Sequence, residues 1–138
     1  MISGLAHVNL LVPPGTLDKA EAFYGGTLGL TPRPVPALQK GMLAWFDIGS
    51  SGQQVHVAFD KNDSNAIKSS RHPCFKIESP EALLQLRQKV WEHHERGDES
   101  APQEADRPGD LDSGAKGVEY PSRFFARDYA GNRLEFSL

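Results

Sequence analysis

The chain has 138 residues, a formal net charge of −3 and 38% hydrophobic residues. This length suits one domain with a sizeable core, and the acidic balance argues against a nucleic-acid or membrane-surface binder. Because Cys74 is the only cysteine, no internal disulfide can form, which favours a reducing, cytoplasmic location. We expect no signal peptide and no membrane span, since the N-terminus lacks the required basic and apolar regions and no apolar run is long enough.

The first half of the chain predicts the order strand, helix, strand, strand, strand. Apolar and mixed positions alternate in the first strand. Thr16 is the expected N-cap of the helix, and Gly25 and Gly26 are expected to end it. The expected elements are a strand over 5–12, a helix over 17–24 and strands over 27–33, 42–48 and 53–59.

The second half predicts a similar order after a polar linker at 61–71. Ser79 as N-cap, Pro80 at the first helical position and Gly97 as the stop define a helix. The last strand alternates cleanly, and Glu135 lies on its polar face. The expected elements are a strand over 72–78, a helix over about 80–94 and a hairpin of strands over 123–127 and 133–138.

Two stretches of the chain occur twice. A shift of 79 positions places His56 on Glu135, and a shift of 65 positions places His7 on His72. Two matches in the same order indicate a duplicated unit. The shifts differ by 14, so the second copy should carry about that many extra residues between its start and its end.

The duplication defines one domain built from two modules. Module one covers about 1–60, and module two covers about 72–138 with an acidic insertion at about 98–117. The 79-residue shift also aligns Phe46 with Phe125. We interpret the acidic insertion as a solvated, mobile loop that is dispensable for folding, and a lid over a site is the alternative.

Four potential metal ligands occupy the less apolar faces of the strands: His7, His56, His72 and Glu135. If the two copies curve into one sheet, these side chains can converge in its concavity. Neutral imidazoles with a carboxylate suit Fe, Mn, Zn or Ni. The structural alternative for each histidine is a half-buried ring satisfied by its neighbours, and for Glu135 it is a solvated carboxylate on an edge strand.

Other residues could line the same concavity and bind a substrate. Arg123 suits a carboxylate or phosphonate, or is a surface arginine. Asn9 could hydrogen-bond a substrate oxygen or a neighbouring residue. Trp45 and Phe125 could wall an apolar pocket or pack in the core, and Cys74 is a thiol near the metal or a small buried residue.

These residues resemble the vicinal oxygen chelate superfamily, which includes glyoxalase I, extradiol dioxygenases, fosfomycin-resistance thiol transferases and bleomycin-resistance proteins. The similar stretches are AHVNLLVP, AEAFYGGTLGL and FFARDYAGNRLEF. The resemblance covers nearly the whole chain outside about 98–122. It implies an α+β fold of paired βαβββ modules that form an open, cupped β-barrel with helices on the outer face.

By the same resemblance, His7, His72 and Glu135 fall on metal-ligand positions. His56 falls where glyoxalase I has a ligating glutamate, so a second carboxylate that could shuttle protons is missing, and His56 is itself a catalytic candidate. This departure argues against a glyoxalase I activity in particular.

Two functions remain open at this point. The first is a divalent-metal-dependent enzyme that chelates a small oxygen-bearing substrate and acts as a lyase or isomerase, a thiol transferase or a dioxygenase. The second is a metal-free protein that binds or sequesters a small molecule, as drug-resistance members of the superfamily do. For either function we expect a homodimer, with no nucleic-acid or membrane partner.

Overall fold

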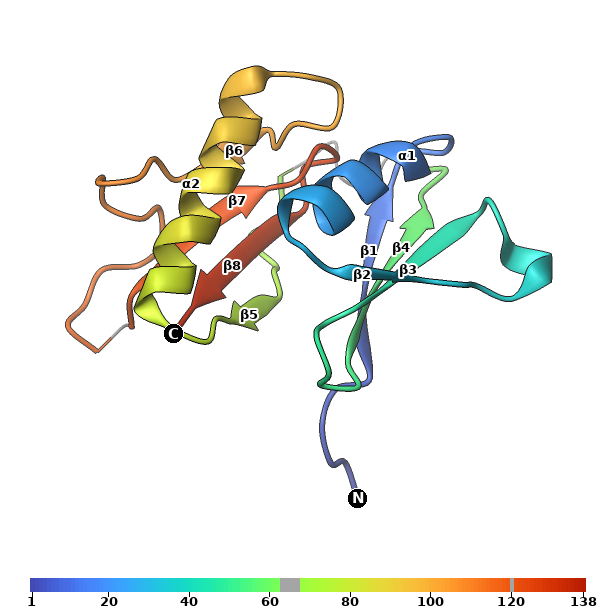
Figure 1. Cartoon of the computed structure of the whole chain (residues 1–138), viewed down its shortest axis with the longest axis horizontal. Helices are drawn as coiled ribbons and strands as arrows, with labels where there is room; N and C mark the ends of the chain where they lie inside the picture. Colours follow the sequence, from blue (N-terminus) through green and yellow to red (C-terminus); the bar gives the residue numbers. More distant parts are fainter. Residues whose placement is uncertain (63–67, 120) are drawn as a thin grey trace. The chain divides into compact units, whose positions relative to one another are not determined.

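The computed structural model describes residues 1–62, 68–119 and 121–138. The chain divides into two compact units, Met1–Ala66 and Ile67–Leu138, and each unit contains its own four-stranded sheet (Figure 1). Residues 63–67 of the expected linker at 61–71 lie outside the described residues. Within the described part of the chain, no helix combines the length and apolar character needed to cross a membrane.

The first unit has the predicted βαβββ order. Its elements are β1 (His7–Val12), α1 (Leu17–Ala20), the π-helix η1 (Glu21–Thr27), β2 (Thr31–Arg33), the 3-10 helix η2 (Ala37–Gln39), β3 (Leu43–Asp47) and β4 (Gln54–Phe59). The strands lie in the order β1-β4-β3-β2, with β1 parallel to β4 and the other pairs antiparallel. The central strands β4 and β3 carry the fully buried Val55, Val57 and Phe46.

The prediction that Gly25 and Gly26 end the first helix is wrong. The helical turns continue through both glycines as η1, and the N–H of Leu28 donates to the carbonyl of Phe23, five residues back, at 2.9 Å. Phe23 and its neighbour Tyr24 are completely buried. Burial of these two rings therefore holds the wide turn together where glycine propensity alone would end it.

The second unit repeats the order of the first. Its elements are β5 (Cys74–Lys76), α2 (Pro80–Arg96), β6 (Glu104–Ala105), β7 (Arg123–Arg127) and β8 (Arg133–Ser137), in the sheet order β5-β8-β7-β6. Helix α2 packs on this sheet (Figure 1). The hydroxyl of Ser79 accepts from the N–H of Ala82 at 3.1 Å, and Gly97 takes the left-handed conformation at φ 64°. Both predicted ends of the helix are confirmed.

Strand register confirms the duplication. In the first sheet Asn9 of β1 lies opposite His56 of β4, and in the second sheet Cys74 of β5 lies opposite Glu135 of β8. Asn9 and Cys74 are 65 positions apart, and His56 and Glu135 are 79 positions apart. These are the two shifts found in the sequence, so the α+β class and the paired βαβββ modules are established. Within the described residues the strands form two four-stranded sheets, neither of which closes into a barrel.

The 14 extra residues of the second copy are divided between two places. Pro32 lies opposite Phe46 of β3, and Ala105 lies opposite Ala126 of β7 in the equivalent place. Pro32 and Ala105 therefore correspond to each other, at a shift of 73 positions. Trp45 lies opposite His56 as Phe125 lies opposite Glu135, at a shift of 80. The extra residues of the second copy therefore lie partly before β6, because α2 is longer than the helix of the first copy, and partly between β6 and β7. The first copy's hairpin is one residue longer, so the alignment of Phe46 with Phe125 is wrong by one position.

The turn between β7 and β8 is organised by a buried carboxylate. Asp128 has no exposed surface, and its Oδ1 accepts from the N–H groups of Ala130 and Asn132, each at 2.9 Å. Gly131 adopts a φ of 93°, which a residue with a Cβ rarely takes. Because register follows the turn, this arrangement fixes Glu135 opposite Phe125.

The acidic segment is packed against the second unit, so its interpretation as a solvated loop is wrong for the residues around β6. Arg87 of α2 binds this segment through three backbone carbonyls, those of Asp106, Arg107 and Asp110, at 2.7 to 3.3 Å. The Asp106 carboxylate accepts from the N–H of Phe125 at 2.8 Å. Composition alone could not reveal these bonds, because they use backbone groups.

Candidate metal and substrate site

In the second unit, His72 and Glu135 contact each other directly. Glu135 lies on β8, and its Oε2 is 2.9 Å from Nε2 of His72. The ring of His72 also meets the Phe125 ring edge-on, with 5.6 Å between centroids. His72 precedes the strand that was predicted to contain it, because β5 begins at Cys74.

The position of His72 is set by hydrogen bonds to the backbone in front of β5. Its Nδ1 donates to the carbonyl of Ser70 at 2.7 Å. Arg127 donates to the carbonyl of Ser69 at 2.9 Å and is itself held by Glu104, with Nε 3.0 Å from Oε2. This anchoring replaces strand pairing, and no sequence pattern indicates it.

The bond to Ser70 also fixes the tautomer of His72. A carbonyl oxygen can only accept, so Nδ1 must carry the proton, and the lone pair of the neutral ring is then on Nε2. Nε2 is the atom that faces Glu135. A histidine held by a carbonyl behind it, with a carboxylate in front of it, is the arrangement that binds a divalent metal in proteins. These two side chains therefore fit a metal by their donor atoms.

The side chain of Arg123 is engaged with the protein on several sides. Its Nη1 is 3.2 Å from Oε1 of Glu135, its Nε is 3.5 Å from Oδ1 of Asp112, and its Nη2 donates to the carbonyl of Ala115 at 2.5 Å. Only 7% of the side chain is exposed. Arg123 therefore holds the far oxygen of Glu135, which leaves Oε2 to face His72.

Residues 112–116 form a strap across Arg123 and Phe125. A Cβ placed on Gly114 would lie 2.6 Å from Nη2 of Arg123 and 2.6 Å from Cε2 of Phe125, so only glycine fits there. The alternative interpretation of the acidic segment as a cover over a site is consistent with this contact, because Phe125 lies opposite Glu135.

Two further residues of this sheet face contribute to its chemistry. Arg133 stacks on the Phe125 ring, with its Cζ 4.3 Å from the ring centroid, and sequence reasoning missed it although it shares the face of Glu135. Cys74 is exposed, and its pKa is raised, first by desolvation and also by the nearby charge of Glu135. The thiol therefore stays protonated at neutral pH.

In the first unit, three rings form a stack on the sheet. His56 lies between His7 and Trp45, with centroids 3.9 Å and 4.8 Å away and interplanar angles of 12° and 16°. Asn9 is exposed beside them, directly opposite His56. Burial lowers the pKa of His56, and the neighbouring His7 lowers it further. The His56 ring therefore favours its neutral form.

A chain of polar side chains fixes the His56 ring. Gln54 donates its amide N–H to Asp47 at 2.8 Å, so the amide oxygen is left to accept from Nε2 of His56 at 2.8 Å. Asp47 in turn lies 3.3 Å from Nε of Arg33. The proton of His56 is thus on Nε2, and the lone pair is on Nδ1.

The stack decides how many ligands the first unit can offer to one ion. A ring nitrogen binds a metal in the plane of its ring, and two planes inclined by only 12° and stacked at 3.9 Å do not meet within metal–ligand reach. His7 and His56 therefore cannot both bind one ion in this conformation. His7 is exposed, whereas Nε2 of His56 is occupied by Gln54.

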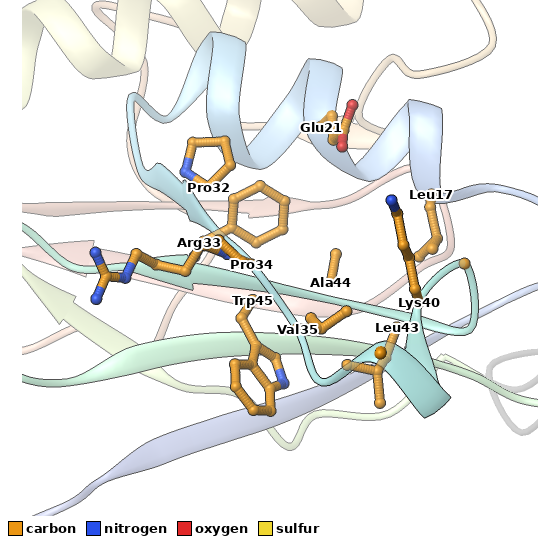
Figure 2. Close-up of a pocket in the computed structure, with 13 residues that line it drawn as sticks. Leu17, Glu21, Pro32, Arg33, Pro34, Val35, Lys40, Leu43, Ala44 and Trp45 are labelled. Carbon is orange, nitrogen blue, oxygen red and sulfur yellow. The ribbon is translucent and has the colours of Figure 1, made fainter.

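A hollow of about 530 Å³ opens at the edge of the first sheet (Figure 2). It lies where the chain leaves β2, between helix α1, the segment 34–41 and β3. Its walls are mainly apolar, including Leu17, Val35 and Ala44, and Lys40 and Arg33 are its cations. Trp45 lines this hollow and also stacks on His56, so it links the hollow to the ring stack.

The structure thus places the predicted ligands in two pairs. His7 and His56 belong to the first unit, and His72 and Glu135 belong to the second. Across residues 1–62, 68–119 and 121–138, no three His, Cys, Asp or Glu side chains gather as a metal site. Convergence of the two pairs on one ion therefore stays a prediction.

Two βαβββ modules, each with a four-stranded sheet, define the fold of the vicinal oxygen chelate superfamily. No family model matches the sequence, and no curated protein matches it. Among solved structures, a glyoxalase family protein from Bacillus anthracis is similar, with 28% identity and a TM-score of 0.71, covering 99% of this chain and 94% of the other.

Two other solved structures share the fold at lower identity. The fosfomycin resistance protein FosX from Listeria monocytogenes is 20% identical, with a TM-score of 0.68, covering 99% of this chain and 92% of the other. Lactoylglutathione lyase from Agrobacterium tumefaciens is 19% identical, with a TM-score of 0.64, covering 99% and 93%. The resemblance to the vicinal oxygen chelate superfamily is confirmed.

Proposed function

We propose that this protein is a divalent-metal-dependent enzyme that acts on a small oxygen-bearing substrate. The observation that carries the proposal is the His72–Glu135 pair, in which the Ser70 carbonyl fixes the tautomer and Nε2 faces a carboxylate. A FosX variant from Listeria monocytogenes, which shares the fold, was solved with Mn(II) and a dihydroxypropylphosphonic acid. This neighbour supports a metal in the same superfamily.

We assign His72 and Glu135 as the metal ligands of the second unit, and His7 as the metal-ligand candidate of the first unit. His72 and Glu135 have the donor geometry described above, and His7 is the exposed member of the ring stack. Fe, Mn, Zn and Ni all suit this donor set. When bound, such an ion supplies a positive charge that polarises neighbouring oxygens of the substrate.

The other residues have supporting roles in this proposal. Arg123 is a positioning residue for Glu135, because its guanidinium is already engaged by Glu135 and the strap. His56 orients His7 by stacking and remains the candidate acid–base group, with a neutral ring and a fixed tautomer. Trp45 is an apolar surface for the substrate, whereas Phe125 is only 4% exposed and packs against Arg133 and His72.

Asn9 completes the proposed substrate-binding set. It is exposed beside His56 and can donate to a substrate oxygen. The hollow next to Trp45 could accept an apolar part of the substrate (Figure 2). We further propose a cytoplasmic homodimer. Light scattering at micromolar concentration should give twice the chain mass.

The second candidate function is metal-free binding of a small molecule. It is favoured by the direct contact of His72 with Glu135, which satisfies both groups without an ion if the ring is doubly protonated. It predicts that ligands, but not metals, stabilise the fold.

Metal analysis of protein purified without a histidine tag separates the two functions. The wild type should retain close to one equivalent of metal after incubation with Mn(II), Fe(II), Zn(II) or Ni(II) and desalting. Glu135→Ala should lose it, and Glu78→Ala should keep it, since Glu78 is an exposed carboxylate two residues after β5. The metal should raise the melting temperature of the wild type and of Glu78→Ala only.

The variant His56→Gln tests the role of the ring stack. If His56 is an acid–base group, this variant keeps the metal-induced rise in melting temperature and loses turnover. Loss of the rise would make it a ligand and would contradict the stacked geometry. If no metal shifts the melting curve of the wild type, the metalloenzyme proposal is wrong and the metal-free function replaces it.

A further inference from the structure

Three arginines lie on the face of the second sheet that carries Glu135. Arg123 and Arg127 belong to β7, and Arg133 belongs to β8. Register places Arg133 directly opposite Arg127. Arg133 is also two residues before Glu135 in β8, so both side chains lie on the same face of the strand. Like charges directly opposite each other in a sheet are unfavourable unless something offsets them. Their partners therefore show which of these cations are used by the fold.

Two of the three guanidinium groups are engaged within the protein. Arg123 is held by Glu135 and the strap. Arg127 bonds three groups, the carboxylate of Glu104 at 3.0 Å, the carbonyl of Gly131 at 2.9 Å and the carbonyl of Ser69 at 2.9 Å. Both side chains are at least nine-tenths buried. Their roles are structural, and a ligand cannot reach them without displacing these bonds.

Arg133 differs from both. Its guanidinium carbon Cζ lies over the Phe125 ring, 4.3 Å from the centroid, and the residue is only partly buried. Among the described residues, no carboxylate or carbonyl accepts a hydrogen bond from it. The cation–π contact holds the group over the ring and leaves its N–H donors without an acceptor among the described residues. The result is an oriented, partly desolvated cation whose charge is not offset.

We propose that Arg133, stacked on Phe125, is the binding residue for the oxyanion group of the substrate. A planar guanidinium held by a ring matches the two oxygens of a carboxylate or phosphonate, which it binds through parallel hydrogen bonds. The bound anion also offsets the charge of Arg133, since the charge of Arg127 is already paired with Glu104. The sequence assigned this role to Arg123, whose donors the structure engages elsewhere.

The location of Arg133 gives the inference its functional meaning and rests on the proposed function. The ring of Phe125 contacts Arg133 on one side and meets the ring of His72 edge-on. A group bound by Arg133 therefore lies next to the His72–Glu135 pair. The substrate class is a small molecule that carries a carboxylate or phosphonate beside the oxygens that the metal would chelate.

Anion binding to protein treated with EDTA tests this inference without using activity. The probes are acetate and methylphosphonate, with acetamide as the neutral isostere of acetate, and the dissociation constant is measured by ligand-observed NMR. The wild type should bind at least one of the anions and not acetamide. Arg133→Gln should weaken binding by about tenfold or more, as loss of a charge-assisted pair does. Arg133→Lys should weaken it less, because an ammonium keeps the charge but not the planar pair of donors.

Arg107→Gln is the matched control, because Arg107 is an exposed arginine of the same unit and loses the same charge. It should bind the anions as the wild type does. Equal binding by Arg133→Gln and the wild type would overturn the inference. So would an equal loss in Arg107→Gln, which would indicate general charge attraction, or the absence of anion binding by the wild type with and without Mn(II).

The two proposals fail separately. Anion binding that depends on Arg133 in a protein that takes up no metal would support the inference and refute the metalloenzyme. Metal uptake that depends on Glu135, together with an anion affinity that is unchanged in Arg133→Gln, would support the metalloenzyme and refute the inference about Arg133. The urea midpoint of Arg133→Gln should stay close to that of the wild type, which shows that any loss of binding is not loss of fold.

Discussion

Replacement of Asp106 by alanine should destabilise the second unit strongly, although Asp106 lies in an acidic segment whose composition predicts a solvated loop. Strand β6 ends at Ala105, so no backbone carbonyl of that strand can reach the N–H of Phe125. The Asp106 carboxylate takes that place at 2.8 Å, while its own N–H donates to the carbonyl of Phe125 at 3.0 Å. The side chain thus extends the ladder by one residue.

The magnitude follows from what alanine leaves unpaired. Phe125 is only 4% exposed, so its N–H would be left in a place that water hardly reaches. An unsatisfied buried donor costs about 1–3 kcal/mol. The second bond of the carboxylate, from the N–H of Ser113 at 3.1 Å, is exposed and should be replaced by water. We therefore expect a loss of about 2 kcal/mol, or a fall of about 1 M in the urea midpoint.

Urea unfolding followed by circular dichroism measures this loss, and Asp110→Ala is the control. Asp110 lies in the same segment and carries the same charge, but within the described residues only its backbone groups are used, the carbonyl by Arg87 and the N–H by the carbonyl of Arg107. It should change the free energy of unfolding by less than about 0.5 kcal/mol. If Asp106→Ala and Asp110→Ala have equal midpoints, the carboxylate does not complete the ladder and the segment is a solvated loop after all.

Three further predictions concern other parts of the fold. Gly114→Ala should cost about 1–3 kcal/mol of unfolding free energy, because its Cβ would lie 2.6 Å from the Arg123 guanidinium; an unchanged urea midpoint would show that the strap can move away. Leu134→Ala should cost about 2–5 kcal/mol, since this side chain is completely buried, and a smaller loss in chemical denaturation would mean that the core of the second sheet collapses around the gap. The hydrogen bond from the hydroxyl of Ser100 is the main cause that lowers the pKa of Asp98 to about 2. The ionised Asp98 carboxylate therefore contributes its full stabilisation above the ordinary pKa of 3.8, and this stabilisation is lost as pH falls through about 2. Unfolding free energies measured between pH 4 and pH 2 should fall less steeply for Asp98→Asn than for the wild type, and equal slopes would refute the assignment.

The fold was predictable from the sequence because its main signals are local. Alternating strand faces, the Ser79 and Gly97 ends of α2 and the two repeat shifts all depend on residue order, and the register pairs confirm them. The end of the first helix was not predictable, since burial of Phe23 and Tyr24 outweighs two glycines. Neither was the packing of the acidic segment, which depends on backbone hydrogen bonds.

The candidate site was predictable only in part, for a related reason. Residue type and strand face could nominate His72 and Glu135, and the structure places their side chains in contact. The partners of an arginine are set by three-dimensional neighbours that are distant in sequence. Face alternation therefore could not distinguish the engaged Arg123 from Arg133, whose N–H donors have no acceptor in the described part of the chain.

The buried Asp128 turn constrains how the gene for this protein can change. The two copies differ in length between the second and third strands and in the turn of the last hairpin, while the strand pairing is kept. A single codon inserted between Asp128 and Asn132 would break the bonds from Ala130 and Asn132 and release the register. A slip by one residue would turn Glu135 toward the helix side and bring Leu134 to the face that now carries Glu135. Natural length variation should therefore spare this turn, and it is the wrong place for an engineered insertion.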